Sequence, residues 1–401
     1  MSSEGFKVLQ TIGTRYLVAF LNLLLVFINA KVLGVEAVGL VAIVLASMNL
    51  AVMFNSIFCG STIVYFMNRY GLFAILIPAY LWAILGSALA ACIMLGLDLF
   101  PTDYWKDVYI LAMLNSLIAA NSRFLLGKAR IGAFNGVYFL QGGFLFICLL
   151  LFYFVLGEKS IAAYLQALYL ANLMALLISF FFLRHDLQSL VPLKGRKYGL
   201  VLKEMFIYGI WSNVDNLAET LSSRLNYFFV QRFVGLGGVG LLDGGTKISE
   251  SVWHISRAVG YIVNGEVARS DNERTQRQIT FHLLKWTFLS TLLVMLVILC
   301  IPEKIYTDYL FTDEFSGISE VIQWLSPGIV ALACNTILSQ YFIASGRVRY
   351  SALASCVGLL VLLLLGCFLV PLWGVNGGAA ATSIAFCTMF CVSRVLIGRL
   401  K

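Results

Sequence analysis

Charged residues are scarce in this 401-residue chain: only 12% of its positions are Asp, Glu, Lys or Arg, whereas 60% are hydrophobic. No soluble domain could bury that much apolar surface, so the composition predicts an all-α, multi-pass membrane protein. Histidine is rare as well, and the three histidines form no metal-ligand grouping with the nine cysteines. We therefore expect no metal site, and we expect the cysteines to serve as small apolar residues.

Long polar segments are also lacking. The connections between apolar runs are shorter than about twenty residues, which leaves no room for a catalytic or nucleotide-binding domain outside the membrane. We expect neither an enzyme nor a nucleic-acid-binding protein, and the short polar start predicts no cleaved signal peptide. The predicted spans are 11–34, 38–66, 72–97, 108–127, 134–156, 161–183, 204–232, 240–268, 281–301, 321–345, 350–370 and 374–397.

Basic residues gather in alternate connections, and this bias predicts the orientation of the chain. One side holds Lys7, Arg69, Lys128, Arg130, Arg184, Lys194, Arg196, Lys197, Lys203, Arg269, Arg274, Arg277, Arg347, Arg349, Arg394, Arg399 and Lys401. The other side holds Lys106, Lys159 and Lys304 together with Asp98, Asp103, Asp107, Glu158, Asp308, Asp313 and Glu314. Both termini are therefore expected on the cytoplasmic side, as an even number of spans requires.

The chain contains an internal repeat. Residues 31–40 (KVLGVEAVGL) and 232–241 (RFVGLGGVGL) match in a cation, a Gly, a Val-Gly pair and a Leu. Residues 127–130 (GKAR) and 346–349 (GRVR) give a second echo. These matches predict a six-helix bundle used twice, at 1–190 and 191–401, with the copies related by an axis along the membrane normal.

The glycine run 235–240 also fits the G-x-G-x-x-G dinucleotide pattern. That pattern needs a preceding strand within a βαβ unit, and none is expected here. A sharp turn with close helix approach is the better interpretation of these glycines.

Spans seven and eight break the apolar rule. They carry Asp215, Glu219, Arg224, Arg232, Asp243, Lys247, Glu250, Arg257 and Glu266. A charge at mid-bilayer costs at least about 2.5–3.5 kcal/mol on insertion scales, so these residues are expected to face a protein interior or an aqueous cavity. Two interpretations overlap: the charges neutralise one another so that two helices can insert and pack, or they line a cavity for a charged substrate.

The two spans run in opposite directions, and each helix rises by about 1.5 Å per residue. The numbers of two residues at the same depth therefore have a nearly constant sum, about 472–475. This rule couples Asp215 with Arg257, Glu219 with His254, Arg224 with Glu250, and Arg232 with Asp243. It leaves Lys247 opposite Asn226, without an acidic partner. Asp243, Lys247, Glu250, His254 and Arg257 recur at three- and four-residue spacing and therefore share one helix face.

The first two spans are the counterparts of this charged pair in the repeat. Arg15, Asn22 and Asn29 lie at seven-residue intervals on one helix face, and Ser47, Asn49 and Asn55 follow on the second span. Arg15, Lys31 and Arg123 have an alternative role as cations at the membrane interface, since long basic side chains near span ends reach out to the headgroups.

With these features the chain resembles the multidrug/oligosaccharidyl-lipid/polysaccharide (MOP) exporter superfamily, most closely the polysaccharide-transporter branch with its Wzx-like O-antigen flippases. The resemblance rests on the twelve spans, the parallel six-plus-six repeat and the two turns at 31–40 and 232–241. It implies two bundles around a central V-shaped cavity, as in MATE-type (multidrug and toxic compound extrusion) members, and alternating access. The implied substrate is an oligosaccharide on polyprenyl pyrophosphate, moved to the outer leaflet of a bacterial inner membrane.

The residues expected to bind this substrate follow from its charge, because arginine binds phosphate oxygens in a bidentate way. Phosphate contacts are assigned to Arg15, Arg224, Lys247 and Arg257, then to Arg123 and Lys31; sugar contacts are assigned to Asn22, Asn29, Asn55 and Asn226. Asp215, Glu219, Asp243, Glu250 and His254 would balance these cations or carry a coupling ion, H+ or Na+. No other cofactor is expected.

The sequence leaves two alternative functions open. An ion-coupled exporter of small organic cations would depend on Asp215 and Glu219 more than on the basic residues. A membrane glycan polymerase or transferase would need a larger loop than this chain offers. The expected partners are the lipid-linked glycan, membrane lipids, and the polymerase and glycosyltransferases of the same pathway. We expect a monomer.

Overall fold

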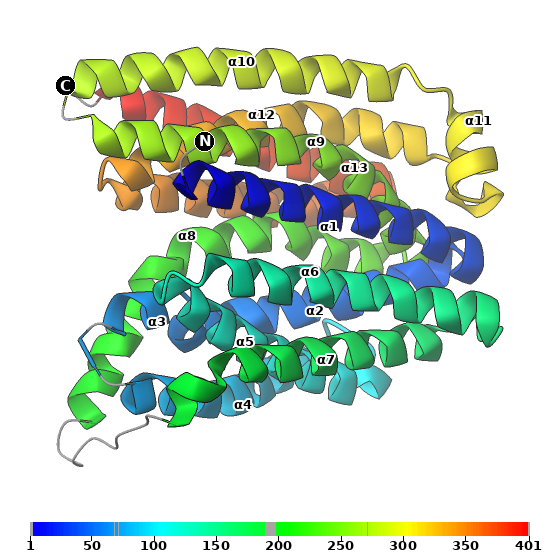
Figure 1. Ribbon diagram of the computed structural model, residues 1–401. Helices are drawn as coiled ribbons and strands as arrows, with labels where there is room; N and C mark the ends of the chain where they lie inside the picture. The colour runs from blue at the N-terminus through cyan, green and yellow to red at the C-terminus, as the bar shows by residue number, and fades with distance from the viewer. Residues whose placement is uncertain (1–2, 68, 71, 189–197, 271, 400–401) are drawn as a thin grey trace. The chain divides into compact units, whose positions relative to one another are not determined.

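The computed structural model describes residues 3–67, 69–70, 72–188, 198–270 and 272–399, and the side chains in these ranges except those of 3–12, 15, 72, 187–188, 198 and 268. Every regular element within them is a helix, which confirms the predicted all-α class (Figure 1). Lys194, Arg196, Lys197, Lys401 and the expected domain boundary at residue 190 lie outside the described residues, as do the side chains of Lys7 and Arg15.

The helices follow the predicted spans closely. They are α1 (Ser3–Leu33), α2 (Val35–Cys59), α3 (Ser61–Phe66), α4 (Leu72–Gly96), η1 (Thr102–Tyr104), α5 (Trp105–Gly127), α6 (Ile131–Leu150), η2 (Leu151–Val155), α7 (Ile161–Gln188), α8 (Tyr198–Phe233), α9 (Leu236–Arg269), α10 (Glu273–Leu299), α11 (Glu303–Ile305), η4 (Tyr306–Leu310), η5 (Asp313–Phe315), α12 (Ile318–Ala344) and α13 (Val348–Arg399).

Nine helical segments of the described chain are long and apolar enough to cross a membrane. One of them, α13, holds the last two predicted spans, which meet at Gly374 with a φ of 57°. The charged helices α8 and α9 have 36 and 34 residues and are long enough as well. Eight segments with one span each, α13 with two, and α8 and α9 with one each give the predicted twelve spans.

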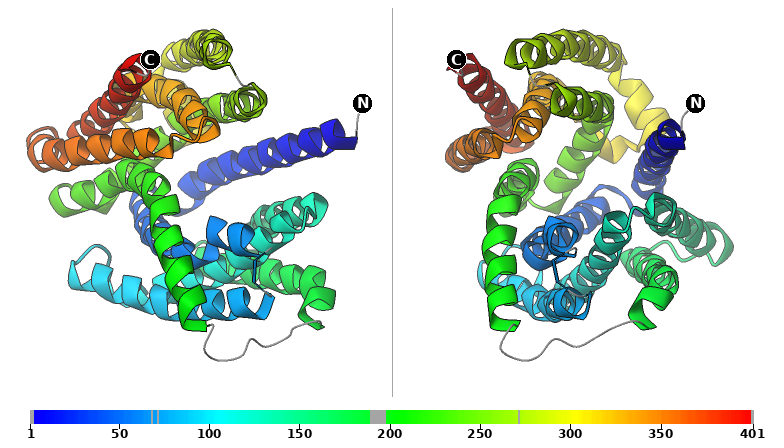
Figure 2. Two further views of the ribbon diagram at one scale, coloured as in Figure 1. Left: turned by 90° about the vertical axis from the view of Figure 1, so that its left-hand side faces the viewer. Right: turned by 60° about the vertical axis from the view of Figure 1, so that its left-hand side comes forward.

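Two details differ from the sequence-based expectation. The second span is broken at Gly60, whose ψ of −139° ends α2 before the short helix α3 begins. The connection between spans nine and ten is not an open loop, because α11, η4 and η5 lead the chain from the end of α10 to the start of α12 (yellow in Figure 2).

The helices group into two compact units. Unit 1 contains residues 1–25 and 43–217, and unit 2 contains 26–42 and 218–401. The predicted repeats divide the chain by sequence, whereas these units also assign the end of α1 and the start of α2 to unit 2. The six-helix repeat at 1–190 and 191–401 stays a prediction.

In unit 1, α5 packs against α4 and α7, and α6 packs against α7. The first half of α8 belongs to this unit and lies directly on α2. A Cβ at Gly209 of α8 would meet the carbonyl oxygen of Ile57 at 2.0 Å, so the two backbones touch. Nearby, the Asn213 side chain donates to the Ser56 carbonyl at 3.0 Å.

In unit 2, α9 packs against α10 and α12, and α12 packs against α13. The starts of α2 and α9 cross in backbone contact: a Cβ at Gly39 would meet the Leu236 carbonyl oxygen at 1.9 Å, and one at Gly240 would meet that of Val35 at 2.0 Å. The glycine motif therefore serves close helix approach, as predicted. Gly34 turns the chain with a φ of +80°, and the Glu314 carboxylate accepts from the Val35 N–H at 2.8 Å.

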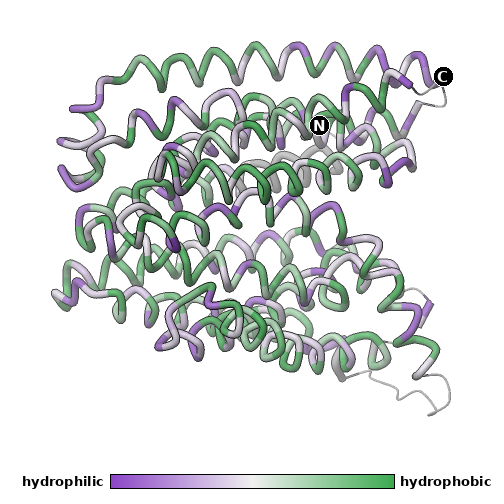
Figure 3. Tube along the Cα trace, turned by 180° about the vertical axis from the view of Figure 1, so that it is seen from behind, coloured by the Kyte–Doolittle hydropathy of each residue, from purple (hydrophilic) through white to green (hydrophobic). Residues whose placement is uncertain are grey.

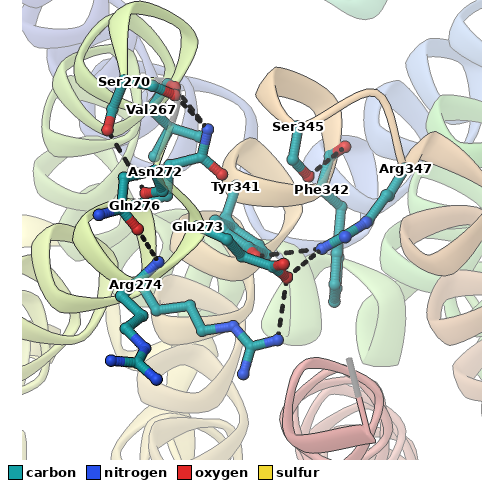
Figure 4. Close-up of polar contacts among 11 residues, drawn as sticks. Val267, Ser270, Asn272, Glu273, Arg274, Gln276, Tyr341, Phe342, Ser345 and Arg347 are labelled. Carbon is teal, nitrogen blue, oxygen red and sulfur yellow. Dashed lines mark hydrogen bonds and ion pairs between the residues drawn. The ribbon is translucent and has the colours of Figure 1, made fainter. Parts of the chain in front are cut away.

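The opposite end of unit 2 is held by a carboxylate. Glu273 at the start of α10 accepts from Arg277 at 3.0 Å and from Arg347, between α12 and α13, at 2.9 Å (Figure 4). Unit 1 has a related contact, an ion pair of 3.1 Å between Arg130 and Asp186. Arg130 and Arg347 belong to the matching segments 127–130 and 346–349. In each unit an arginine of this segment therefore pairs with a carboxylate near the end of another helix, Asp186 in α7 or Glu273 in α10.

Candidate functional site

Hydrophilic residues interrupt the hydrophobic helices at short intervals (Figure 3), and in unit 2 the interruptions on α8 and α9 meet. Arg224 of α8 and Glu250 of α9 form an ion pair with 2.9 Å between Nη2 and Oε2. Their side chains are only 17% and 14% exposed. The equal-depth rule predicted this pair, and the geometry confirms it.

A phenol extends the pair into a chain of four groups. The Tyr227 hydroxyl accepts a hydrogen bond from Arg224 Nη1 at 2.9 Å and donates one to Asp243 Oδ1, also at 2.9 Å. Both Tyr227 and Asp243 are buried. The rule coupled Asp243 with Arg232, whose side chain is exposed. It considered charged residues only, so it missed the hydroxyl that serves Asp243.

Lys247 lies between these two carboxylates along α9, four residues after Asp243 and three before Glu250. It therefore shares their helix face. Its side chain is half-buried, and within the described part of the chain its ammonium makes no hydrogen bond or ion pair. Lys247 is close enough to Glu250 to interact with it electrostatically. The two carboxylates nevertheless take their hydrogen bonds from Tyr227 and Arg224, so the N–H donors of Lys247 are left for another acceptor.

Arg257, two turns after Glu250 on α9, is exposed and lies over an aromatic ring. Its guanidinium carbon is 3.8 Å from the centroid of the Trp253 ring. The indole N–H of Trp253 donates to the hydroxyl of Thr336 on α12 at 2.8 Å. Sequence reasoning missed both Trp253 and Thr336 because neither is charged; the aromatic residue four positions before a span arginine was the available signal.

The remaining acidic and titratable candidates are Asp215 of unit 1 and Glu219 and His254 of unit 2. Asp215, Glu219 and His254 are half-buried, and each has an interaction partner in the structure.

Asn226 and Asn55 are buried in helix contacts. Asn226 donates to Thr382 of α13 at 2.8 Å and to the Gly378 carbonyl at 2.5 Å. Asn55 donates to Ser87 and Ser116 at 2.7 and 2.8 Å. In both cases the side-chain N–H groups serve packing within a unit.

The other candidates of the N-terminal half are spread out. Asn22, Lys31 and Arg123 are exposed, Asn29 is half-buried, and the side chain of Arg15 is outside the described set. The buried polar contacts that unit 1 makes around Asn55 involve uncharged groups. Gln141 likewise donates to Asn115 and Asn172 at 3.0 and 2.7 Å. The charged network described above thus belongs to unit 2.

The fold and the buried charges define a class: a polytopic, all-α membrane protein with ionised side chains inside its spans. Solved structures place it more closely. The chain is similar to the lipid II flippase MurJ in an inward closed conformation, with a TM-score of 0.77 and 15% identity over 98% of this chain and 87% of that one. It is similar to an inward-facing MATE family transporter of the MOP superfamily, with a TM-score of 0.73 and 14% identity over 95% and 94%.

A third structure of this fold is a MOP superfamily transporter from Pyrococcus furiosus, with a TM-score of 0.60 and 15% identity over 98% of this chain and 94% of that one. Among curated proteins, a proposed O-antigen transporter from Shigella flexneri is 22% identical over 233 residues, which are 58% of this chain and 54% of that protein. The match thus spans about half the length of this relative. No family profile matches the chain.

This chain has the fold of these MOP superfamily transporters, which is the fold that the resemblance implies.

Proposed function

We propose that this protein is a flippase that moves a polyprenyl-pyrophosphate-linked oligosaccharide from the cytoplasmic to the outer leaflet of a bacterial inner membrane. The O-antigen transporter and the lipid II flippase among its relatives support a lipid-linked glycan as the substrate class. Such a substrate carries two phosphates through about 30 Å of hydrocarbon, so the protein must offer cations within its spans.

The observation that carries the proposal is that no described residue hydrogen-bonds to the Lys247 ammonium or forms a close ion pair with it. An ammonium in a span is costly unless an anion or water meets it. Its two acidic neighbours on α9 are bound to Tyr227 and Arg224 at 2.9 Å each. A substrate phosphate supplies oxygen acceptors for the Lys247 ammonium. Arg257, exposed on the same helix face, supplies a second cation of the kind that binds phosphate.

Arg224 acts differently in this proposal. It is committed to Glu250 and Tyr227, so it holds the shape of the network and adds to the local positive potential. Arg15, Lys31 and Arg123 remain candidates for phosphate contacts in the first half of the chain, and Asn22 and Asn29 for sugar contacts. Asp215, Glu219 and His254 remain candidates for a coupling ion.

The test is transport in vesicles reconstituted with the purified protein and a labelled polyprenyl-pyrophosphate sugar, measured as accessibility of the label from each side. We expect Lys247→Ala to lower the initial rate by at least about tenfold, because a hydrogen bond to a charged group contributes roughly 1.5–3 kcal/mol. Lys247→Arg should retain much of the rate.

The matched control is Lys159→Ala, which removes an exposed lysine from a connection and should leave transport unchanged. Arg224→Ala is a poorer test, since it leaves Glu250 buried without its partner and destabilises the fold. Wild-type transport at the rate of protein-free vesicles, or full transport by Lys247→Ala, would refute the proposal.

The MATE transporter fold supports a second candidate, ion-coupled export of small organic cations. Asp215 and Glu219 favour it, because both acids are half-buried on α8 within a predicted span. Under this alternative, Asp215→Asn and Glu219→Gln would abolish efflux of a cationic dye, and Lys247→Ala would leave efflux unaffected.

A further inference from the structure

We infer that Trp253 and Thr336 are positioning residues for Arg257, and that the three together form a rigid oxyanion subsite that binds one phosphate group edge-on. This inference rests on the proposed function for the identity of the cargo, a diphosphate. The arrangement itself is read from contacts within unit 2.

The chain of contacts begins at the backbone of α12. The Thr336 hydroxyl donates to the carbonyl of Leu332 at 2.9 Å, one turn earlier. Its proton is therefore directed along the helix, and a lone pair is left to accept the Trp253 N–H at 2.8 Å. A hydroxyl bonded in this way has one rotamer, and the indole bonded to it has one orientation.

The contact between α9 and α12 continues further along both helices. Asn264 of α9 donates to Gln340 of α12 at 3.0 Å, and a Cβ at Gly260 would come within 3.1 Å of the Gln340 side chain. Trp253, Gly260 and Asn264 thus lie on the α9 face that packs against α12. The indole is tied to α12 through Thr336, and Arg257 lies over its ring.

The guanidinium of Arg257 lies over the Trp253 ring, with its carbon 3.8 Å from the ring centroid, which is the distance of a stacked pair. Stacking on an aromatic ring leaves the N–H groups at the edge of the guanidinium unused. In the part of the chain that the structure describes, none of them takes part in a hydrogen bond or ion pair, and the side chain is exposed. The edge therefore presents a fork of donors, and a fork matches two oxygens of one phosphate.

The position of Arg257 along α9 explains why its side chain needs the support of the Trp253 ring. Arg257 precedes the end of the predicted span by eleven residues, which is about 16 Å along a helix axis. An unsupported arginine at that depth would extend toward the headgroups, as long cations near span ends do. The stack on Trp253 holds it in the span, and pre-ordering lowers the entropy cost of binding.

The experiment separates positioning from packing. Thr336→Val keeps the shape of the side chain and removes the acceptor of the indole N–H, whereas Thr336→Ser keeps the hydroxyl. Binding of inorganic pyrophosphate to the full-length protein in detergent is measured by isothermal titration calorimetry. The half-saturating concentration and the maximal rate of transport are measured in vesicles.

We expect Thr336→Val and Arg257→Lys each to weaken pyrophosphate binding by about tenfold and to raise the half-saturating substrate concentration with little change in maximal rate. Thr336→Ser should restore binding. The control is Thr388→Val, because the Thr388 hydroxyl also donates to a carbonyl one turn earlier, at 2.8 Å, but accepts no indole. Its pyrophosphate affinity should equal that of the wild type.

The outcomes separate the two proposals. Transport of the lipid-linked sugar with unchanged pyrophosphate affinity in Thr336→Val and Arg257→Lys would overturn the subsite and leave the flippase function standing. Arg257-dependent pyrophosphate binding without transport of the lipid-linked sugar would support the subsite and refute the flippase. A fall in maximal rate alone in Thr336→Val would mean that Thr336 only packs, which also overturns the inference.

Discussion

At the scale of single residues, the hydroxyl of Tyr227 links two charges. It accepts from Arg224 and donates to Asp243, and both distances are 2.9 Å. Asp243 is 8% exposed, so water reaches it poorly and the phenol is the donor that the structure records for it. The network therefore depends on a neutral group as much as on its ion pair.

Tyr227→Phe should destabilise the protein while leaving the Arg224–Glu250 ion pair in place. The substitution leaves Asp243 buried without this donor, which costs about 1–3 kcal/mol. Thermal denaturation in detergent measures the effect as a lower midpoint. Tyr309→Phe is the control, because the Tyr309 side chain is 72% exposed. Equal midpoints for wild type and Tyr227→Phe would show that Asp243 is stabilised in another way.

The sequence predicts a contact in the site only where residue numbers alone determine which side chains meet. Depth along two antiparallel spans depends only on residue numbers, so the contact of Arg224 with Glu250 was predictable. The surroundings of Asn226 were not, because its amide bonds to Thr382, which lies 156 positions away on α13. The Trp253 ring under Arg257 is likewise held by Thr336, which lies on another helix, α12. Contacts between distant helices require knowledge of their packing.

At the scale of elements, the helices were predictable because apolar length alone defines a span in lipid. The helix ends were less predictable. Helix α8 begins at Tyr198, six residues before the predicted start at 204, because amphipathic turns continue outside the apolar stretch. The break at Gly60 and the short helices between α10 and α12 have no signal in hydropathy. Glycine roles were predictable only where the repeat marked them, at Gly39 and Gly240.

Gly39→Ala and Gly240→Ala should each destabilise unit 2. A Cβ at these positions would lie 1.9 and 2.0 Å from the carbonyl oxygens of Leu236 and Val35, and backbone atoms cannot move aside as a flexible side chain can. Forced overpacking of this kind typically costs about 1–3 kcal/mol. The measurement is the thermal denaturation midpoint of the purified protein, with the yield of folded protein as a second readout.

Gly237→Ala is the matched control in the same turn of α9. Its Cβ would meet Glu36 and Val35 side-chain atoms at 3.7 and 3.9 Å, which is ordinary van der Waals contact. We expect its midpoint to equal that of the wild type or to rise slightly, because alanine favours a helix over glycine. A similar loss in all three variants would show that helix approach is not the reason for glycine here.

At the scale of the whole molecule, the two ends of unit 2 differ in charge as the orientation rule requires. One end holds Arg269, Arg274, Arg277, Arg347 and Arg349, of which Arg277 and Arg347 pair with the Glu273 carboxylate. The other end holds Lys304 among Glu303, Asp308, Asp313 and Glu314. Since arginine and lysine are retained on the cytoplasmic side, the arginine-rich end should face the cytoplasm.

Thr275 and Ser316 report on these two ends, because both are exposed and they lie beyond opposite ends of the apolar part of α10. Each is replaced by cysteine in a background in which the exposed native cysteines Cys92, Cys300, Cys367 and Cys391 are serine. In spheroplasts, a membrane-impermeant maleimide should label Ser316→Cys, and it should label Thr275→Cys only after permeabilisation. The opposite pattern would invert the topology. The arginine-rich end of unit 2 would then lie on the outer side of the membrane, against the orientation predicted from the basic residues.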